Sequence, residues 1–191
     1  MLIVTNEVNI ALRYAAEHNS GLEVGGFGHT VEAANGLDII CDDIYIPPQV
    51  VQAAHTDIKG PGEEDGGGML EAGMYYWATH CKWCLRSIEE HEGVQHEFAG
   101  QSWSDNRLWW HSHGKHGVSP SGTDDATLTK LARLLGGWAV GLVVDSSGGR
   151  HAWASVQQGP LSFIGKIEYS AYREEREDLK GRVEAMMRHV E

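Results

Sequence analysis

The segment from Arg107 to Asp145 constrains the fold more than any other part of the chain, because its pattern predicts a strand, a helix and a second strand in close succession. Apolar residues first alternate, then recur at helical spacing from about Thr123, and a Gly-Gly pair precedes an apolar run of strand length. Strands interleaved with helices are typical of layered α/β proteins. We therefore expect a single α/β domain, which a chain of 191 residues can form.

The rest of the sequence predicts further helices and strands. Capping residues, apolar periodicity and turn-forming residues mark their limits. The expected elements are a helix over residues 5–19, a hairpin over 22–30 and 37–46, a helix over 70–88, a strand over 150–156 and a long helix over 165–191.

Two boundaries follow from this pattern. We expect the domain to span residues 1–160, with a helical extension over 161–191. Within the domain, residues 47–68 are rich in Gly and acidic residues and predict a mobile insertion loop. The apolar stripe of the C-terminal extension suits either a homodimer contact or packing against its own domain.

Charge and cysteine content narrow the classes of partner. The chain has 15 Lys and Arg against 27 Asp and Glu, a net charge of −12, which disfavours binding to nucleic acid or to a membrane surface. Three cysteines cannot form a dense disulfide framework and fit a reducing compartment. The N-terminal residues lack the features of a signal peptide, and no apolar run is long enough to cross a membrane. We therefore expect a cytoplasmic protein.

Two of the 11 histidines indicate a metal site. His111 and His113 alternate on a predicted strand, so both imidazoles point to one face. Asp124 falls in the first turn of the next helix and can face back toward the strand end. Two histidines and one carboxylate leave a fourth position for water, which is typical of a catalytic zinc site. Ser121 and Asp124 also fit a helix capping box, and the two interpretations are compatible.

The combined pattern resembles the JAMM motif of catalytically competent MPN (Mov34/JAB) metallopeptidases, which is an upstream Glu followed by His-x-His, seven residues and Ser-x-x-Asp. The matching residues are Glu23, His111, His113, Ser121 and Asp124. The resemblance implies a single MPN domain of cytidine-deaminase-like architecture, in which helices flank a mixed, curved β-sheet.

The same resemblance implies a zinc hydrolase that cuts an isopeptide or peptide bond after the C-terminal tail of a ubiquitin-like protein, its expected partner. One catalytic zinc ion would be held by His111, His113 and Asp124, and its bound water would be the nucleophile. Glu23 would act as general base, and Ser121 would stabilise the oxyanion of the tetrahedral intermediate.

The chain departs from the family pattern at Gly114, where Pro is usual, and it adds an imidazole at His116. We expect His116 to be a solvent-exposed loop residue or a substrate contact rather than a metal ligand, and Trp109 is a second candidate substrate contact. Cys81 and Cys84 lie at helical spacing, which favours core packing over a second metal site.

Two other functions remain open. A noncatalytic MPN-type scaffold would share the fold and bind no metal. A peptidase acting on a phage or cell-wall substrate would share the chemistry but have no ubiquitin-like partner. Metal analysis distinguishes the scaffold from the enzymes, whereas nothing in the sequence names the substrate.

Overall fold

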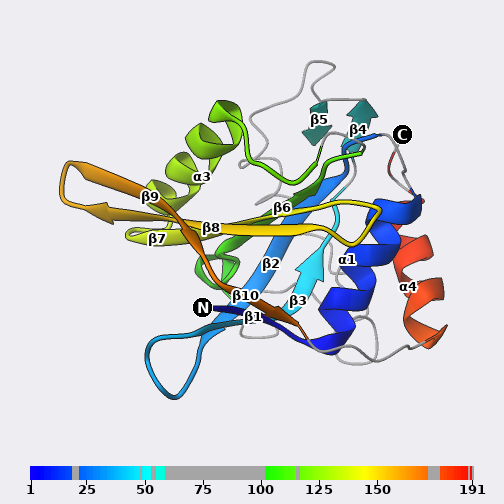
Figure 1. The fold of residues 1–191 in the computed structure, drawn as a ribbon, viewed down its shortest axis with the longest axis horizontal. Coiled ribbons are helices and arrows are strands. Elements are labelled where there is room, and N and C mark those ends of the chain that lie inside the picture. Colours follow the sequence, from blue (N-terminus) through cyan, green and yellow to red (C-terminus); the bar gives the residue numbers. More distant parts are fainter. Residues whose placement is uncertain are drawn as a thin grey trace.

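The computed structural model describes residues 1–18, 22–47, 49–52, 55–58, 102–114, 117–171, 177–188 and 190, and for 50–52, 55–58, 177–179 and 182 it describes the backbone alone. Strands outnumber helices within these residues (Figure 1). The strands are β1 (Leu2–Val4), β2 (Gly25–Glu32), β3 (Ile39–Tyr45), β4 (Gln49–Gln52), β5 (His55–Ile58), β6 (Leu108–Ser112), β7 (Trp138–Val144), β8 (Arg150–Gln158), β9 (Leu161–Ile167) and β10 (Tyr169–Ala171). The helices are α1 (Asn6–His18), α3 (Gly122–Leu134) and α4 (Glu177–Met187), with a short 3-10 turn, η2 (Trp103–Asp105).

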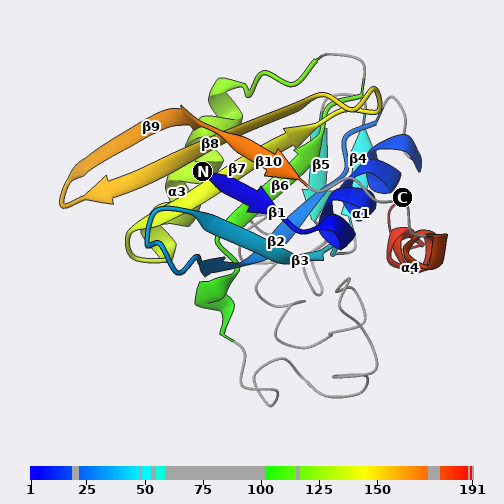
Figure 2. The same cartoon turned by 60° about the horizontal axis from the view of Figure 1, so that its bottom comes forward.

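Eight of the strands form one mixed sheet in the order β10-β1-β3-β2-β6-β7-β8-β9, while β4 and β5 pair separately. Strands β6 and β7 run parallel and are connected through α3. Only Glu168 separates β9 from β10, although these strands lie at opposite ends of the strand order. The sheet therefore curls until its two ends approach each other, and the β8–β9 hairpin extends beyond the rest of the molecule (Figure 2).

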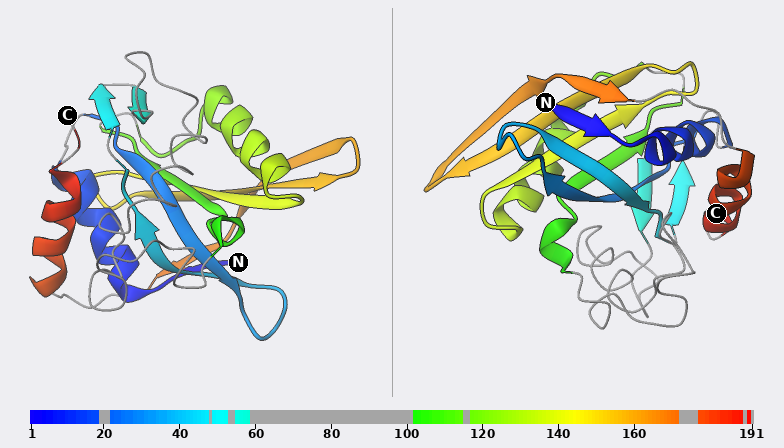
Figure 3. Two further views of the ribbon diagram at one scale, coloured as in Figure 1. Left: turned by 180° about the vertical axis from the view of Figure 1, so that it is seen from behind. Right: turned by 90° about the horizontal axis from the view of Figure 1, so that it is seen from below.

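The sheet buries side chains on both faces. Along β6, Leu108 and Trp110 belong to a core that includes α1 residues, whereas Trp109 belongs to a second core beneath α3. Helices α1 and α4 pack side by side, and α3 lies on the other side of the sheet (Figure 3). Alternation along a strand separates neighbouring side chains in this way.

Several elements agree closely with the sequence pattern. Helix α1, the β2–β3 hairpin and the strand–helix–strand segment formed by β6, α3 and β7 all lie where they were predicted. The C-terminal end of α3 also fits, because Gly136 follows it with a positive φ of 70°. None of the helices within the described residues combines the length and apolar character needed to cross a membrane.

The predicted fold class is wrong. Instead of an α/β MPN domain with helices flanking its sheet and a long C-terminal helix, the described residues form a curled eight-stranded sheet with three short helices. The helices within the described residues contain only 11 to 13 residues each. The difference arises because the segment after β8 adds strands to both ends of the sheet.

The expected C-terminal helical extension over 161–191 illustrates the error. Residues 161–171 form β9 and β10, and the helix α4 spans Glu177–Met187 alone. The turn at Gly159 and Pro160 was the overlooked signal: Gly159 has a φ of 60°, and Gln158 pairs with Leu161 across it. The expected domain boundary at residue 160 thus falls in the turn of a hairpin.

The expected insertion loop also contains structure. Strands β4 and β5 lie within 47–68 and form an antiparallel pair. Residues 59–68, the helix predicted over 70–88 and the cysteines Cys81 and Cys84 lie outside the described residues.

Candidate metal centre

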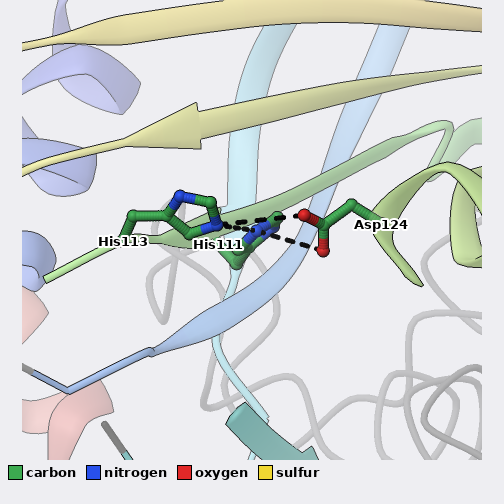
Figure 4. Close-up of side chains that lie close together, drawn as sticks. All are labelled: His111, His113 and Asp124. Atoms are coloured by element: carbon green, nitrogen blue, oxygen red, sulfur yellow. Dashed lines mark hydrogen bonds and ion pairs between the residues drawn. The ribbon is translucent and has the colours of Figure 1, made fainter. Parts of the chain in front are cut away.

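Strand β6 presents two imidazoles to the face covered by α3. The Nε2 atoms of His111 and His113 lie 3.0 Å apart, and both residues are buried (Figure 4). Their period of two along the strand places them on one face, as the sequence predicted.

Asp124 completes a buried group of three with these histidines. Ser121 is the N-cap of α3: its side chain accepts a hydrogen bond from the Asp124 N–H at 3.2 Å, and the Asp124 carboxylate accepts one from the Ser121 N–H at 2.6 Å. This reciprocal capping box fixes the carboxylate at the first turn of the helix. The Asp124 oxygens lie 3.4 Å from His111 Nε2 and 3.9 Å from His113 Nε2.

The Asp124 carboxyl is held in its charged form. Burial raises its pKa, but the hydrogen bond and charge of His111, together with the hydrogen bonds from Ser121, outweigh burial and lower the pKa to about 2. The carboxylate is thus ionised at neutral pH, which is the form that binds a metal ion.

The three residues can hold a metal ion. Their ligand atoms lie within 4.8 Å of one another and come from buried residues. A tetrahedral zinc ion with ligand bonds of 2.0 to 2.1 Å separates its ligand atoms by roughly 3.3 Å. The observed separations of 3.0, 3.4 and 3.9 Å bracket that value, so small side-chain movements would suffice to bind an ion.

Each imidazole is oriented in a different way. The Nδ1–H of His113 donates to the carbonyl oxygen of Gly117 at 2.8 Å, which leaves Nε2 with a lone pair facing Asp124. Gly117 has a positive φ of 77°, a conformation that suits glycine. His111 instead stacks on Trp109 with ring centroids 4.6 Å apart, and no described residue bonds to its buried Nδ1. Packing therefore orients His111.

Glu23 lies beside the three ligand residues. Strands β2 and β6 pair antiparallel, with Gly25 opposite His111, so that continuing the register places Glu23 opposite His113. The Glu23 carboxylate is 3.8 Å from His113 Nε2, and its side chain is 16% exposed. The structure thus brings together four of the five motif residues around one point, and the fifth, Ser121, caps the helix that carries Asp124.

The two predicted substrate contacts have different outcomes. Trp109 is only 3% exposed and packs behind His111 within the second core, so it supports a ligand residue and presents almost no surface to a substrate. His116 lies outside the described residues.

Two residues next to Glu23, Ser112 and Gln49, are not among those that the sequence pattern singled out. Ser112 is 1% exposed and Gln49 is 0% exposed, and both hydrogen-bond to the backbone of residues 22–25. A polar residue in a strand buried on both faces must find partners, so Ser112 could have been recognised from its place in β6. The sequence around Gln49 contains no comparable signal.

Comparisons with known proteins leave the family open. The chain matches no protein-family model and no curated protein. Among solved structures, it resembles the solution structure of protein DSY2949 from Desulfitobacterium hafniense, a structural genomics target, with 12% identity over 94% of this chain and 98% of the other and a TM-score of 0.46. A similarity of that size names neither a family nor an activity.

Proposed function

We propose that this protein is a zinc-dependent hydrolase that cleaves a peptide or isopeptide bond. The observation that supports the proposal most directly is the convergence of His111, His113 and Asp124, with the Glu23 carboxylate 3.8 Å from His113 Nε2. Two imidazoles and one carboxylate are ligands typical of catalytic zinc. Zinc bound by three protein ligands supplies a Lewis acid that lowers the pKa of a water molecule toward neutrality.

Each remaining motif residue has a role that its position allows. Glu23 accepts a proton from the attacking water and delivers it to the leaving amine, because its carboxylate lies next to the ligand atoms. The Ser121 oxygen accepts from the Asp124 N–H, and its own O–H remains a donor suited to the oxyanion of a tetrahedral intermediate. Asp124 stays ionised through its hydrogen bonds to Ser121 and His111.

For the substrate, we propose the C-terminal tail of a ubiquitin-like protein. This part of the proposal is supported by the resemblance of the motif to JAMM metallopeptidases, and the corrected fold adds no support to it. A panel of substrates can decide between this class and unrelated peptides: ubiquitin-like proteins fused through the tail to a reporter, and unstructured peptides carrying the same reporter.

The test of the chemistry is Glu23→Gln compared with the wild-type protein. The variant should keep about one zinc per chain and lose cleavage by roughly 10²- to 10⁴-fold, the range for a positioned general base. Glu32→Gln, at the exposed end of the same strand, is the matched control and should remain active. Cleavage that persists in Glu23→Gln, or in wild-type protein stripped of metal by a chelator, would refute the proposed mechanism.

A further inference from the structure

We infer that Ser112, the residue between the two histidines, is a positioning residue that fixes the Glu23 carboxylate at the metal centre. The inference rests on the proposed function, because it assigns a task to the residue that holds the proposed base. Residues 22–25, called here the Glu23 segment, lie where the paired part of β2 begins.

Ser112 holds the Glu23 segment through three hydrogen bonds. Its backbone N–H donates to the carbonyl oxygen of Val24 at 2.7 Å, and its hydroxyl oxygen accepts from the Val24 N–H at 3.0 Å. The hydroxyl in turn donates to the carbonyl oxygen of Leu22 at 3.3 Å. The side chain thus bonds to the backbone on both sides of Glu23, just beyond the last strand pair, Gly25 with His111.

Gln49 holds the same segment through the next residue. Its side-chain oxygen accepts from the Gly25 N–H at 2.8 Å, and its amide donates to the carbonyl oxygen of Gly25 at 2.8 Å. The amide also donates to the carbonyl oxygen of Pro47 at 2.9 Å. Because backbone groups of successive strand residues point to opposite sides, Ser112 and Gln49 restrain the segment from both edges.

This anchoring matters because the proposed base reaches the centre from the end of a strand. Beyond Gly25, the bond from the Ser112 N–H to Val24 is the backbone pairing of the Glu23 segment with β6, and the side-chain hydrogen bonds of Ser112 and Gln49 add to it on both edges. Displacement of a catalytic group by about 1 Å can cost a reaction roughly 100-fold in rate. His111 and His113, by contrast, lie at the end of β6 and gain their positions from other contacts, which include the bond from the His113 N–H to Val144 at 2.8 Å.

Ser112→Ala tests this role, with Ser155→Ala as the matched control. Ser155 is a fully buried serine on β8 whose hydroxyl accepts a partly buried hydrogen bond from the Gln157 amide, so its replacement removes a buried serine hydroxyl and its bond elsewhere in the sheet. We expect Ser112→Ala to lower kcat about 10- to 100-fold with KM and zinc content unchanged. Ser112→Thr, which restores the hydroxyl, should recover most of that rate. Ser155→Ala should share any loss of thermal stability but keep its kcat.

A double-mutant cycle with Glu23→Gln separates positioning of the base from general loosening. If Ser112 acts through Glu23, Ser112→Ala should not lower further the residual rate of Glu23→Gln, whereas independent effects would multiply. If Glu23→Gln is inactive and Ser112→Ala behaves like Ser155→Ala, the proposed function stands and the positioning role is wrong. If Glu23→Gln is fully active, the proposed function fails.

Amide hydrogen exchange tests the anchoring without a substrate. In Ser112→Ala the Val24 amide should exchange at least about 10-fold faster, since it loses its acceptor, while the Gly28 amide farther along β2 should keep its protection. Unchanged exchange at Val24, or equal acceleration along the whole of β2, would overturn the inference.

Discussion

The Glu23 carboxylate lies 3.8 Å from Nε2 of His113, although the two residues come from segments far apart in the sequence. The antiparallel pairing of β2 with β6 brings them opposite each other, and the adjoining capping box of α3 brings Asp124 to the same point. An acidic group beside a buried group of metal ligands is the relationship on which the proposed hydrolase depends.

Zinc should stabilise the folded protein, because the ligand group forms only when β6 and α3 have folded. Free zinc at about 100 times its Kd adds roughly 2.7 kcal/mol to the free energy of unfolding. This should raise Tm by about 5 to 10 °C in a chain of this size. Thermal unfolding with zinc and with a chelator measures the shift. His111→Ala should abolish it, and His29→Ala, which pairs with Asp42 away from the centre, should preserve it. An equal zinc-dependent rise in Tm in both variants would contradict the assignment of His111 as a zinc ligand.

Trp109→Leu should weaken zinc binding by about 10-fold, as for other residues that orient ligands. The reason is that Trp109 stacks on His111, whose buried Nδ1 has no hydrogen-bond partner among the described residues, so the stack supports the side of the ring away from the ligand atom. Trp110→Leu is the matched control, since its fully buried ring faces the opposite core. Competition with a zinc-binding dye measures affinity for the folded fraction of each variant. Equal loss of affinity in both would exclude a specific role for the stack.

Gly26→Ala should be strongly destabilising, because a methyl group there would overlap the carbonyl oxygen of Tyr45 on the neighbouring strand. A backbone clash inside a sheet requires the strands to move apart. We therefore expect the free energy of unfolding to fall by about 3 kcal/mol. Gly122→Ala, at the start of α3 with open space around it, should be neutral or slightly stabilising. Urea unfolding of both variants provides the comparison, and similar stabilities would contradict the predicted clash.

Asp124 should make the metal-free protein sensitive to acid. Its folded-state pKa of about 2 lies below the ordinary value of 3.8, so its stabilising contribution is present above about pH 4 and is lost as the pH falls toward 2. The stability difference between wild type and Asp124→Asn should therefore narrow by about 2 kcal/mol over that interval. Urea unfolding in a chelator at pH 7, 4 and 2.5 measures it. A difference that stays constant with pH would refute the lowered pKa.

The ligand group was predictable because its determinants are local. Alternation places His111 and His113 on one face of any strand, and a capping box fixes the direction of an Asp at the third helical position. Both rules act within a few residues, and the structure obeys both. The strands and helix that carry these residues were predictable for the same reason.

The C-terminal segment was mispredicted because its pattern is ambiguous. Residues 161–171 contain apolar residues at spacings that suit either a helix or a strand, and only pairing with β8 and β1 selects the strand. The fold class followed that error, since β9 and β10 form both ends of the sheet.

The sequence by itself determined the local geometry of the candidate centre: two imidazoles on one strand face and a carboxylate held by its own helix cap. The tertiary structure alone decided how the Glu23 segment is anchored, through Ser112 and Gln49, and how far the sheet extends. The physical reason is the distance along the sequence over which each interaction acts. Periodicity and capping act between neighbours in the chain, whereas strand pairing and buried side-chain hydrogen bonds depend on which distant segments the fold brings together.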